Sequence, residues 1–227
     1  MAKTLFVTGS GTDVGKTYIT GLILKKFVEN HVGCAYYKAA MSGNERADDG
    51  HLVPGDALFV KKTSGLAQPL DTMCPYLYGA AVSPHLAAKI EGSLINLDVV
   101  LAHYDDLCRQ YDFVTVEGSG GIVCPLRYDE QEIFLEDIIK ARGMGCLLVA
   151  DAGLGTINDV VLSVRYMEAC QIPVRGIVFN RFEPGNVMHE DNRSMCECLT
   201  GVKVVACVKD GDSDIDISID ELKRLYS

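Results

Sequence analysis

The stretch that decides the fold reads Gly9-Ser-Gly-Thr-Asp-Val-Gly-Lys-Thr17. It lies between an apolar run at 4–8 and a segment at 15–30 whose apolar residues recur at helical spacing. In a loop so placed, backbone N–H groups and a helix N-terminus wrap phosphates, the lysine reaches the terminal phosphates and the next hydroxyl binds Mg2+. Five residues rather than four separate Gly9 from Gly15, but the strand–loop–helix context still predicts a nucleotide site.

The rest of the chain alternates short apolar runs with longer helical patterns, which is typical of a parallel α/β sheet. We expect further strands at 34–38, 73–77, 113–117, 146–150, 174–179 and 202–208. Helices are expected at 56–63, 84–90, 97–110, 132–141, 157–170 and 186–199. Strands this apolar are buried on both faces. The sequence therefore predicts one domain over residues 1–227, a doubly wound, mostly parallel sheet with helices on both faces, of P-loop NTPase type. We expect a loop at 42–54 and a mobile acidic tail at 209–216.

Composition narrows the function. A formal net charge of -10 argues against a nucleic-acid partner, because phosphate backbones require a basic face. The most apolar stretch, 144–150, is too short to span a membrane, and the N-terminus lacks the pattern of a signal peptide. We therefore expect a cytoplasmic protein. The nine cysteines contain no C-x-x-C pair and are interpreted as small buried side chains rather than metal ligands.

Two carboxylates are candidates to complete a metal site beside the phosphate loop. Glu117 ends the apolar strand at 113–117, and acids at the carboxyl end of such a strand face the ligand crevice of a doubly wound sheet. The glycines that follow, Gly118, Gly120 and Gly121, let a backbone approach phosphate closely. Asp56 opens the helix at 56–63, so it is either an N-cap, a metal ligand, or both.

The sequence resembles the dethiobiotin synthetase family over most of its length, from the first strand to at least Asn180. Each motif alone is weak, but the family's set occurs here in the family's order. The set is the phosphate loop at 9–17, Tyr37-Lys38-x-x-x-Ser42-Gly43, Asp56-Ala57, Ser83-Pro84-His85, Val116-Glu117-Gly-x-Gly-Gly121, Leu154-Gly155-x-Ile157-Asn158 and Asn180.

The resemblance implies a homodimer with active sites at the subunit interface, acting on 7,8-diaminononanoate, CO2 and ATP with Mg2+. In the family the 7-amino group is carboxylated to a carbamate, which attacks the γ-phosphate to give a carbamic–phosphoric anhydride. The 8-amino group then closes the ureido ring of dethiobiotin and releases phosphate. Both reacting groups are anions, so concentrated positive charge and positioning are the main requirements.

The resemblance also assigns roles. It implies Lys38, Lys16 and Thr12 as catalytic residues, Ser42, Gly155 and Asn158 as substrate contacts, and Thr17, Asp56 and Glu117 as Mg2+ ligands. Nucleotide contacts carry over to Asp13, Val14, Gly15, Lys16, Thr17, Asp56, Glu117, Gly118, Ser119, Gly120 and Asn180, the last as the adenine contact. Since the segment 155–158 starts a helix, its N–H groups suit the substrate carboxylate, across the dimer.

The same motifs also allow alternative functions. A partitioning or cell-division ATPase, which is a dimerising switch rather than a synthetase, would carry a lysine where this chain has Gly11. Amide-forming P-loop ligases normally carry a glutaminase domain, for which 227 residues leave no room. A catalytically inactive paralogue is disfavoured because Lys16, Lys38 and both carboxylates are present together.

Overall fold

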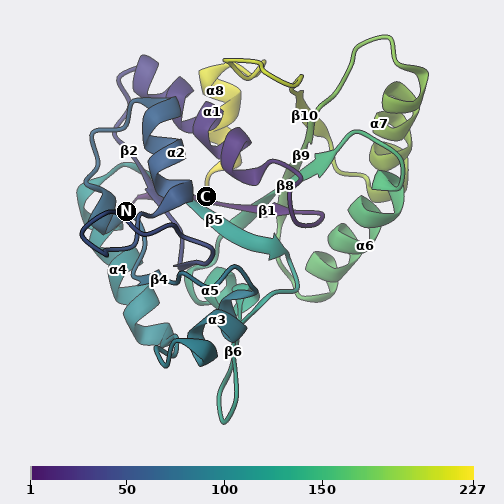
Figure 1. Ribbon diagram of the computed structural model, residues 1–227. Coiled ribbons are helices and arrows are strands. Elements are labelled where there is room, and N and C mark those ends of the chain that lie inside the picture. Colours follow the sequence, from purple (N-terminus) through teal and green to yellow (C-terminus); the bar gives the residue numbers. More distant parts are fainter. Residues whose placement is uncertain (1) are drawn as a thin grey trace.

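A six-stranded parallel sheet forms the centre of the computed structural model, which describes residues 2–227 (Figure 1). The strand order is β10-β9-β8-β1-β5-β2, and every pairing in this sheet is parallel. The strands are β1 (Lys3–Gly9), β2 (Cys34–Tyr37), β5 (Phe113–Gly121), β8 (Gly145–Asp151), β9 (Val174–Asn180) and β10 (Val204–Cys207). From β1 the chain order runs outward through β8, β9 and β10 on one side, whereas on the other side β5 lies between β1 and the edge strand β2. Because all these strands are parallel, the carboxyl ends of β1, β5, β8 and β9 meet at one edge.

Helices cover both faces of this sheet because its strands are apolar on both sides. On β1, Leu5 and Val7 pack into one cluster, with α1 (Lys16–Glu29), α2 (Gly55–Ser64) and α8 (Ile219–Leu225). Phe6 packs into the other cluster. That second cluster is covered by α3 (Pro84–Ile90), α4 (Leu97–Gln110), α5 (Leu135–Arg142), α6 (Thr156–Ala169) and α7 (Val187–Thr200). The predicted doubly wound α/β fold is confirmed.

Two small sheets flank the main one, and one of them corrects a predicted helix. β3 (Ala40–Met41) pairs with β4 (Tyr76–Leu77), with a 3-10 turn at Leu70–Thr72 between them in the chain. β6 (Pro125–Tyr128) and β7 (Glu132–Phe134) form a hairpin. The helix expected at 132–141 therefore starts only at Leu135, because Glu132–Phe134 pairs with β6. The carboxylate of Asp137 accepts a bond from the Phe134 N–H at 2.7 Å and caps the helix there.

The acidic tail at 209–216 is packed against α1, so the expectation of a mobile tail is wrong. Ile215 is buried beside α1, and the Lys26 ammonium donates to its carbonyl at 2.6 Å. The same ammonium pairs with Asp214 at 3.1 Å, and the Tyr18 hydroxyl donates to the Asp212 carbonyl. Apolar residues alternating with acids let this segment lie along α1 and lead into α8.

Within residues 2–227 none of the helices combines the length and apolar character that a membrane crossing requires.

Candidate active site

The phosphate loop runs from the end of β1 into the first turn of α1. Gly15 has φ +95°, and a Cβ there would lie 2.1 Å from Asn180 Nδ2, so only glycine fits beside that amide. The Lys16 ammonium is buried and donates to the Gly11 carbonyl at 2.9 Å, spanning the loop. Burial, followed by repulsion from Lys38, lowers the pKa of Lys16. The loop thus concentrates helix N–H groups and a desolvated cation where phosphates bind.

Lys38 joins the two predicted carboxylates into one cluster. Its ammonium lies 2.6 Å from Asp56 Oδ2 and 2.7 Å from Glu117 Oε1. Glu117 is only 1% exposed, and its carboxylate also accepts bonds from the Thr17 hydroxyl at 2.8 Å and the Tyr36 hydroxyl at 3.1 Å. α2 begins behind Pro54, and the Asp56 side chain bonds to Lys38 rather than to helix N–H groups. The capping alternative for Asp56 is therefore wrong.

The charge state of Lys38 follows from this cluster. Burial alone would lower the pKa of its ammonium, but Glu117 and Asp56 outweigh burial and raise the pKa above the ordinary value of 10.5. Lys38 therefore carries a full positive charge at neutral pH. Burial, together with the Glu117 carboxylate, raises the pKa of the Tyr36 hydroxyl well above its ordinary range, so Tyr36 remains a hydrogen-bond donor.

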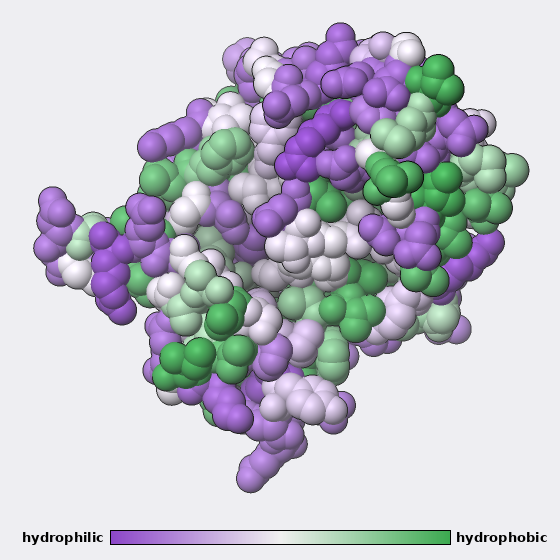
Figure 2. All heavy atoms as spheres, turned by 45° about the vertical axis from the view of Figure 1, so that its right-hand side comes forward, coloured by the Kyte–Doolittle hydropathy of each residue, from purple (hydrophilic) through white to green (hydrophobic). Residues whose placement is uncertain are grey.

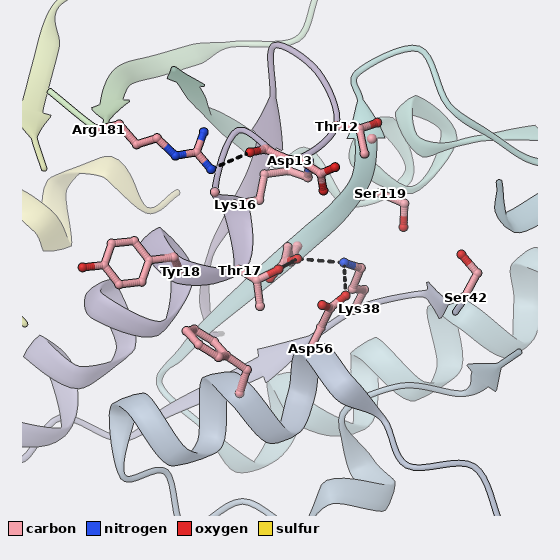
Figure 3. A pocket seen from close by; sticks show the side chains of 14 residues that line it. Thr12, Asp13, Lys16, Thr17, Tyr18, Lys38, Ser42, Asp56, Ser119 and Arg181 are labelled. Atoms are coloured by element: carbon pink, nitrogen blue, oxygen red, sulfur yellow. Dashed lines mark hydrogen bonds and ion pairs between the residues drawn. The ribbon is translucent and has the colours of Figure 1, made fainter. Parts of the chain in front are cut away.

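A cavity of about 690 Å³ opens beside this cluster at the carboxyl edge of the sheet (Figure 3). Eleven of the predicted site residues line it: Thr12, Asp13, Gly15, Lys16, Thr17, Lys38, Ser42, Asp56, Glu117, Ser119 and Gly120. Figure 3 shows Thr17, Lys38 and Asp56 in the middle, Ser42 and Ser119 on one side, and Arg181 and Tyr18 on the other. The cavity therefore has two ends with the charged cluster between them.

Five predicted site residues do not line the cavity. Val14 and Asn180 lie under the phosphate loop, where the Asn180 amide donates to the Val14 carbonyl at 3.1 Å and Asn180 Oδ1 is buried without a partner. Gly118 packs against the Phe6 ring, where a Cβ would lie 2.9 Å from Cε1. The other two, Gly155 and Asn158, are exposed at the start of α6, outside the cavity.

Sequence reasoning missed three residues of the cavity lining, Tyr18, Phe59 and Arg181. The phosphate-loop motif ends one residue before Tyr18, and Phe59 follows from the helical spacing after Asp56. Arg181 directly follows Asn180. That adjacency was the available signal, because residues after a buried strand's end lie at the ligand edge of such a sheet.

The side chains expected to bind Mg2+ suit that ion chemically. Thr17, Asp56 and Glu117 offer only oxygen donors, which Mg2+ prefers. One hydroxyl and two carboxylates leave coordination positions for phosphate oxygens and water, the usual arrangement for nucleotide-bound Mg2+. Across residues 2–227 no group of three or more His, Cys, Asp or Glu side chains could hold a metal, so the described protein offers no complete cage of its own.

The fold and the loop define a P-loop nucleotide-binding protein. The family model described as "AAA domain" matches residues 3–213. The ATP-dependent dethiobiotin synthetase BioD of Brachyspira hyodysenteriae is 47% identical over 217 residues, which cover 95% of this chain and 96% of that protein. The ATP-dependent dethiobiotin synthetase BioD of Clostridium botulinum strain Eklund 17B is 41% identical over 226 residues, which cover 100% of this chain and 99% of that protein. The chain belongs to the family of ATP-dependent dethiobiotin synthetases, which are ligases that use ATP.

A solved structure of the MinC:MinD cell division protein complex from Aquifex aeolicus shares the fold at a TM-score of 0.59. The match covers 98% of this chain and 86% of the other at 13% sequence identity. Identity this low shows the common fold alone. It therefore adds no support to the alternative of a partitioning or cell-division ATPase.

Proposed function

We propose that this chain closes the cyclic urea of dethiobiotin from 7,8-diaminononanoate, CO2 and ATP. The observation that carries the proposal is the position of Lys38. Its ammonium sits on Glu117 and Asp56 in the same cavity as the phosphate-loop residues Lys16 and Thr17. A phosphoryl transfer between two anions needs such paired cations, and a second lysine at the end of a strand, facing the phosphate loop, supplies the cation for the attacking anion.

The reaction begins when the 7-amino nitrogen attacks CO2 and loses a proton, giving a carbamate. A carbamate oxygen then attacks the γ-phosphorus of ATP, and ADP leaves. The 8-amino nitrogen attacks the carbonyl carbon of the anhydride, phosphate leaves with the former carbamate oxygen, and the ring closes with loss of a proton. The substrate supplies both nucleophiles, so the protein needs no nucleophile of its own and acts by positioning and by charge.

The residues divide these tasks along the cavity. Lys16 neutralises the terminal phosphates, and Lys38 stabilises the negative charge that the carbamate brings to them. Thr12 and Ser42 carry hydroxyls toward the other end of the cavity, where they orient the diamine by hydrogen bonds. Mg2+, when bound, would be held by Thr17, Asp56 and Glu117 and would neutralise phosphate charge. Asn180, the adenine contact that the resemblance implies, has an Oδ1 that is buried under the phosphate loop without a partner, so it becomes an acceptor for the adenine amino group when the loop moves to expose it.

We also infer a homodimer with the substrate bound between subunits. Gly155 and Asn158 lie outside the cavity on exposed surface, so they serve the carboxylate of a substrate that reaches beyond its own subunit. Large apolar side chains are exposed around them, including Leu154 at 94%, Val187 at 84% and Leu162 at 61%. Figure 2 brings the side of α6 and α7 forward and shows apolar groups among charged ones.

All nine cysteines are free thiols, which fits a reducing cytoplasm.

Phosphate release with ATP, MgCl2 and bicarbonate, with and without 7,8-diaminononanoate, tests the proposal. Release must depend on the diamine, and mass spectrometry must find dethiobiotin carrying the carbon of isotopically labelled bicarbonate. Diamine-independent hydrolysis would instead favour the switch ATPase. Nucleotide binding without turnover would favour an inactive paralogue.

A further inference from the structure

The two oxygens of the buried Glu117 carboxylate have different surroundings. Oε1 accepts bonds from the Thr17 hydroxyl at 2.8 Å and the Lys38 ammonium at 2.7 Å, and both of these residues line the cavity (Figure 3). Oε2 accepts a bond from the Tyr36 hydroxyl at 3.1 Å, and Tyr36 is fully buried in the cluster that α1 and α2 cover. One oxygen therefore serves the cavity, and the other is bound from the protein interior.

Tyr36 is held in place through its backbone. β2 lies at the edge of the main sheet, where a strand leaves backbone groups open on its outer side. The Gln68 side chain fills this place, because its Oε1 accepts the Tyr36 N–H at 2.8 Å and its Nε2 donates to the Tyr36 carbonyl at 3.0 Å. Gln68 is only 2% exposed, and its Nε2 also donates to the Thr72 hydroxyl at 3.1 Å. The amide thus pairs with Tyr36 as a residue of a neighbouring strand would, and it fixes the residue whose ring reaches Glu117.

The Tyr36 hydroxyl determines which oxygen Glu117 offers to the cavity. A phenylalanine ring would fill the same space in the core, so packing alone does not require the hydroxyl. With Oε2 bound from inside, Glu117 presents the single oxygen Oε1 to Thr17 and Lys38. Mg2+ demands near-octahedral coordination, whereas Ca2+ accepts both oxygens of one carboxylate in a more flexible geometry. A carboxylate restrained in this way therefore suits the smaller ion.

We propose that Tyr36 is a positioning residue for the metal site, whose hydroxyl holds the Glu117 carboxylate so that Oε1 alone faces the cavity. The inference rests on the proposed function, because it takes Glu117 as a Mg2+ ligand. Outer hydrogen bonds of this kind orient a ligand before the metal arrives, and losing one typically costs about 10- to 100-fold in metal affinity. Tyr36 lies outside the cavity lining and acts through Glu117.

The test measures how strongly the binding of a nonhydrolysable ATP analogue depends on the metal. Calorimetry gives the dissociation constants of β,γ-methylene-ATP with saturating MgCl2, with CaCl2 and with EDTA, for the wild type, Tyr36→Phe and Gln68→Met. Gln68→Met frees the backbone of Tyr36 without changing either side chain of the contact with Glu117. Tyr37→Phe is the matched control, because the Tyr37 hydroxyl is also buried but donates to the Val100 carbonyl at 2.7 Å, in the cluster on the other face of the sheet. Thermal melts check that each variant folds.

Tyr36→Phe should weaken the Mg2+ complex of the analogue by about 10- to 100-fold, whereas the affinity in EDTA should stay within about threefold of the wild type. The loss with Ca2+ should be smaller than the loss with Mg2+, since the freed Oε2 lets the carboxylate offer both oxygens. Gln68→Met should show the same metal-selective loss to a smaller extent, and Tyr37→Phe should show none. Equal losses with and without metal would show that Tyr36 only supports the fold, and an unchanged affinity for the Mg2+ complex would remove it from the metal site; either overturns the inference.

Diamine-dependent phosphate release separates this inference from the proposed reaction. If Tyr36→Phe weakens the Mg2+ complex selectively but the wild type forms no dethiobiotin, the proposed reaction is rejected and the positioning role of Tyr36 is retained. If dethiobiotin forms and Tyr36→Phe leaves the metal dependence unchanged, the reaction stands and the positioning role is rejected.

Discussion

Replacing Lys38 with methionine separates its structural from its chemical role. Methionine keeps most of the length of the stem but removes the ammonium from Glu117 and Asp56. Glu117 is 1% exposed, so its carboxylate would keep only the Thr17 and Tyr36 hydroxyls as partners. Breaking a buried ion pair by removing one partner costs about 3 to 5 kcal/mol. The Asp56 side chain is 40% exposed, so its ion pair with Lys38 contributes to stability only as much as a surface pair does, about 0 to 1 kcal/mol.

These magnitudes predict a stability loss that depends on pH and on the partner. The melting temperature of Lys38→Met should fall by roughly 6 to 20 °C, the range for chains of this size. Because the pKa of Lys38 is raised in the folded protein, its stabilisation is complete below the ordinary value of 10.5 and is lost as pH rises through the folded value. The difference from wild type should therefore be constant from neutral pH to about 10 and shrink above it. Lys38→Met with Glu117→Gln should recover much of the loss, since removing both charges is often nearly neutral.

Catalysis should fall far more than nucleotide binding. We expect kcat to drop about 100- to 1,000-fold, the usual effect of losing one electrostatic stabiliser, with the dissociation constant of ATP within about threefold of wild type. Denaturation curves, calorimetry and diamine-dependent phosphate release measure the three quantities. Lys140→Met is the control, because Lys140 pairs with Glu136 at 2.9 Å on an exposed part of α5 and should change none of them appreciably. An unchanged melting temperature would refute the buried-pair argument, and equal losses of ATP binding and kcat would remove Lys38 from its catalytic role.

Three further experiments test other parts of the structure. Gly15→Ala should cost more than about 2 kcal/mol and abolish ATP binding, because a Cβ there collides with a buried amide; Gly50→Ala, with φ +87° and nothing within 4 Å, should cost about 1 kcal/mol and keep binding. If the chain forms the dimer proposed above, Leu154→Asp should turn it into monomers in light scattering and raise KM for the diamine, whereas Val99→Asp, at an exposed position of α4, should do neither. A monomeric wild type would contradict the proposed dimer. Iodoacetamide near pH 8 should label Cys198 first, since it is the exposed cysteine and burial raises the pKa of most of the others. Equally fast labelling of several thiols would contradict the buried arrangement.

Most of the fold could be predicted because its signals are local. The helix at 97–110 was delimited correctly because Asn96 caps it, accepting bonds from the N–H groups of residues 98 and 99. Pro84 marked the start of α3 in the same way. The β6–β7 hairpin had no such signal, since three residues are too few to show a period. The tail at 209–216 was misjudged because its partners lie on α1, almost two hundred residues earlier.

The residues that line the candidate cavity could mostly be predicted one by one, but their arrangement could not. Each of Lys38, Asp56 and Glu117 was placed at the end of a strand or the start of a helix, where ligands bind in such folds. The contacts among these side chains depend on the order of the strands in the sheet. Lys38 and Glu117 are 79 residues apart in the chain, and they meet because β2 pairs with β5. Arg181 was missed for the same reason, since both of its hydrogen-bond partners come from other strands and loops.

The cluster at Lys38 is costly for the fold, and that cost supports its functional interpretation. Its neighbours on the strands, Tyr37 and Val116, are fully buried, so an apolar pair in place of Lys38 and Glu117 would suit the core equally well. Replacing a buried ion pair with apolar residues is often neutral or stabilising by about 1 to 4 kcal/mol. Stability alone therefore gives no reason to place an ammonium and a carboxylate inside this sheet. The reaction gives one, because it needs a fixed positive charge and a carboxylate beside the phosphates, held away from water in a position that the fold sets in advance.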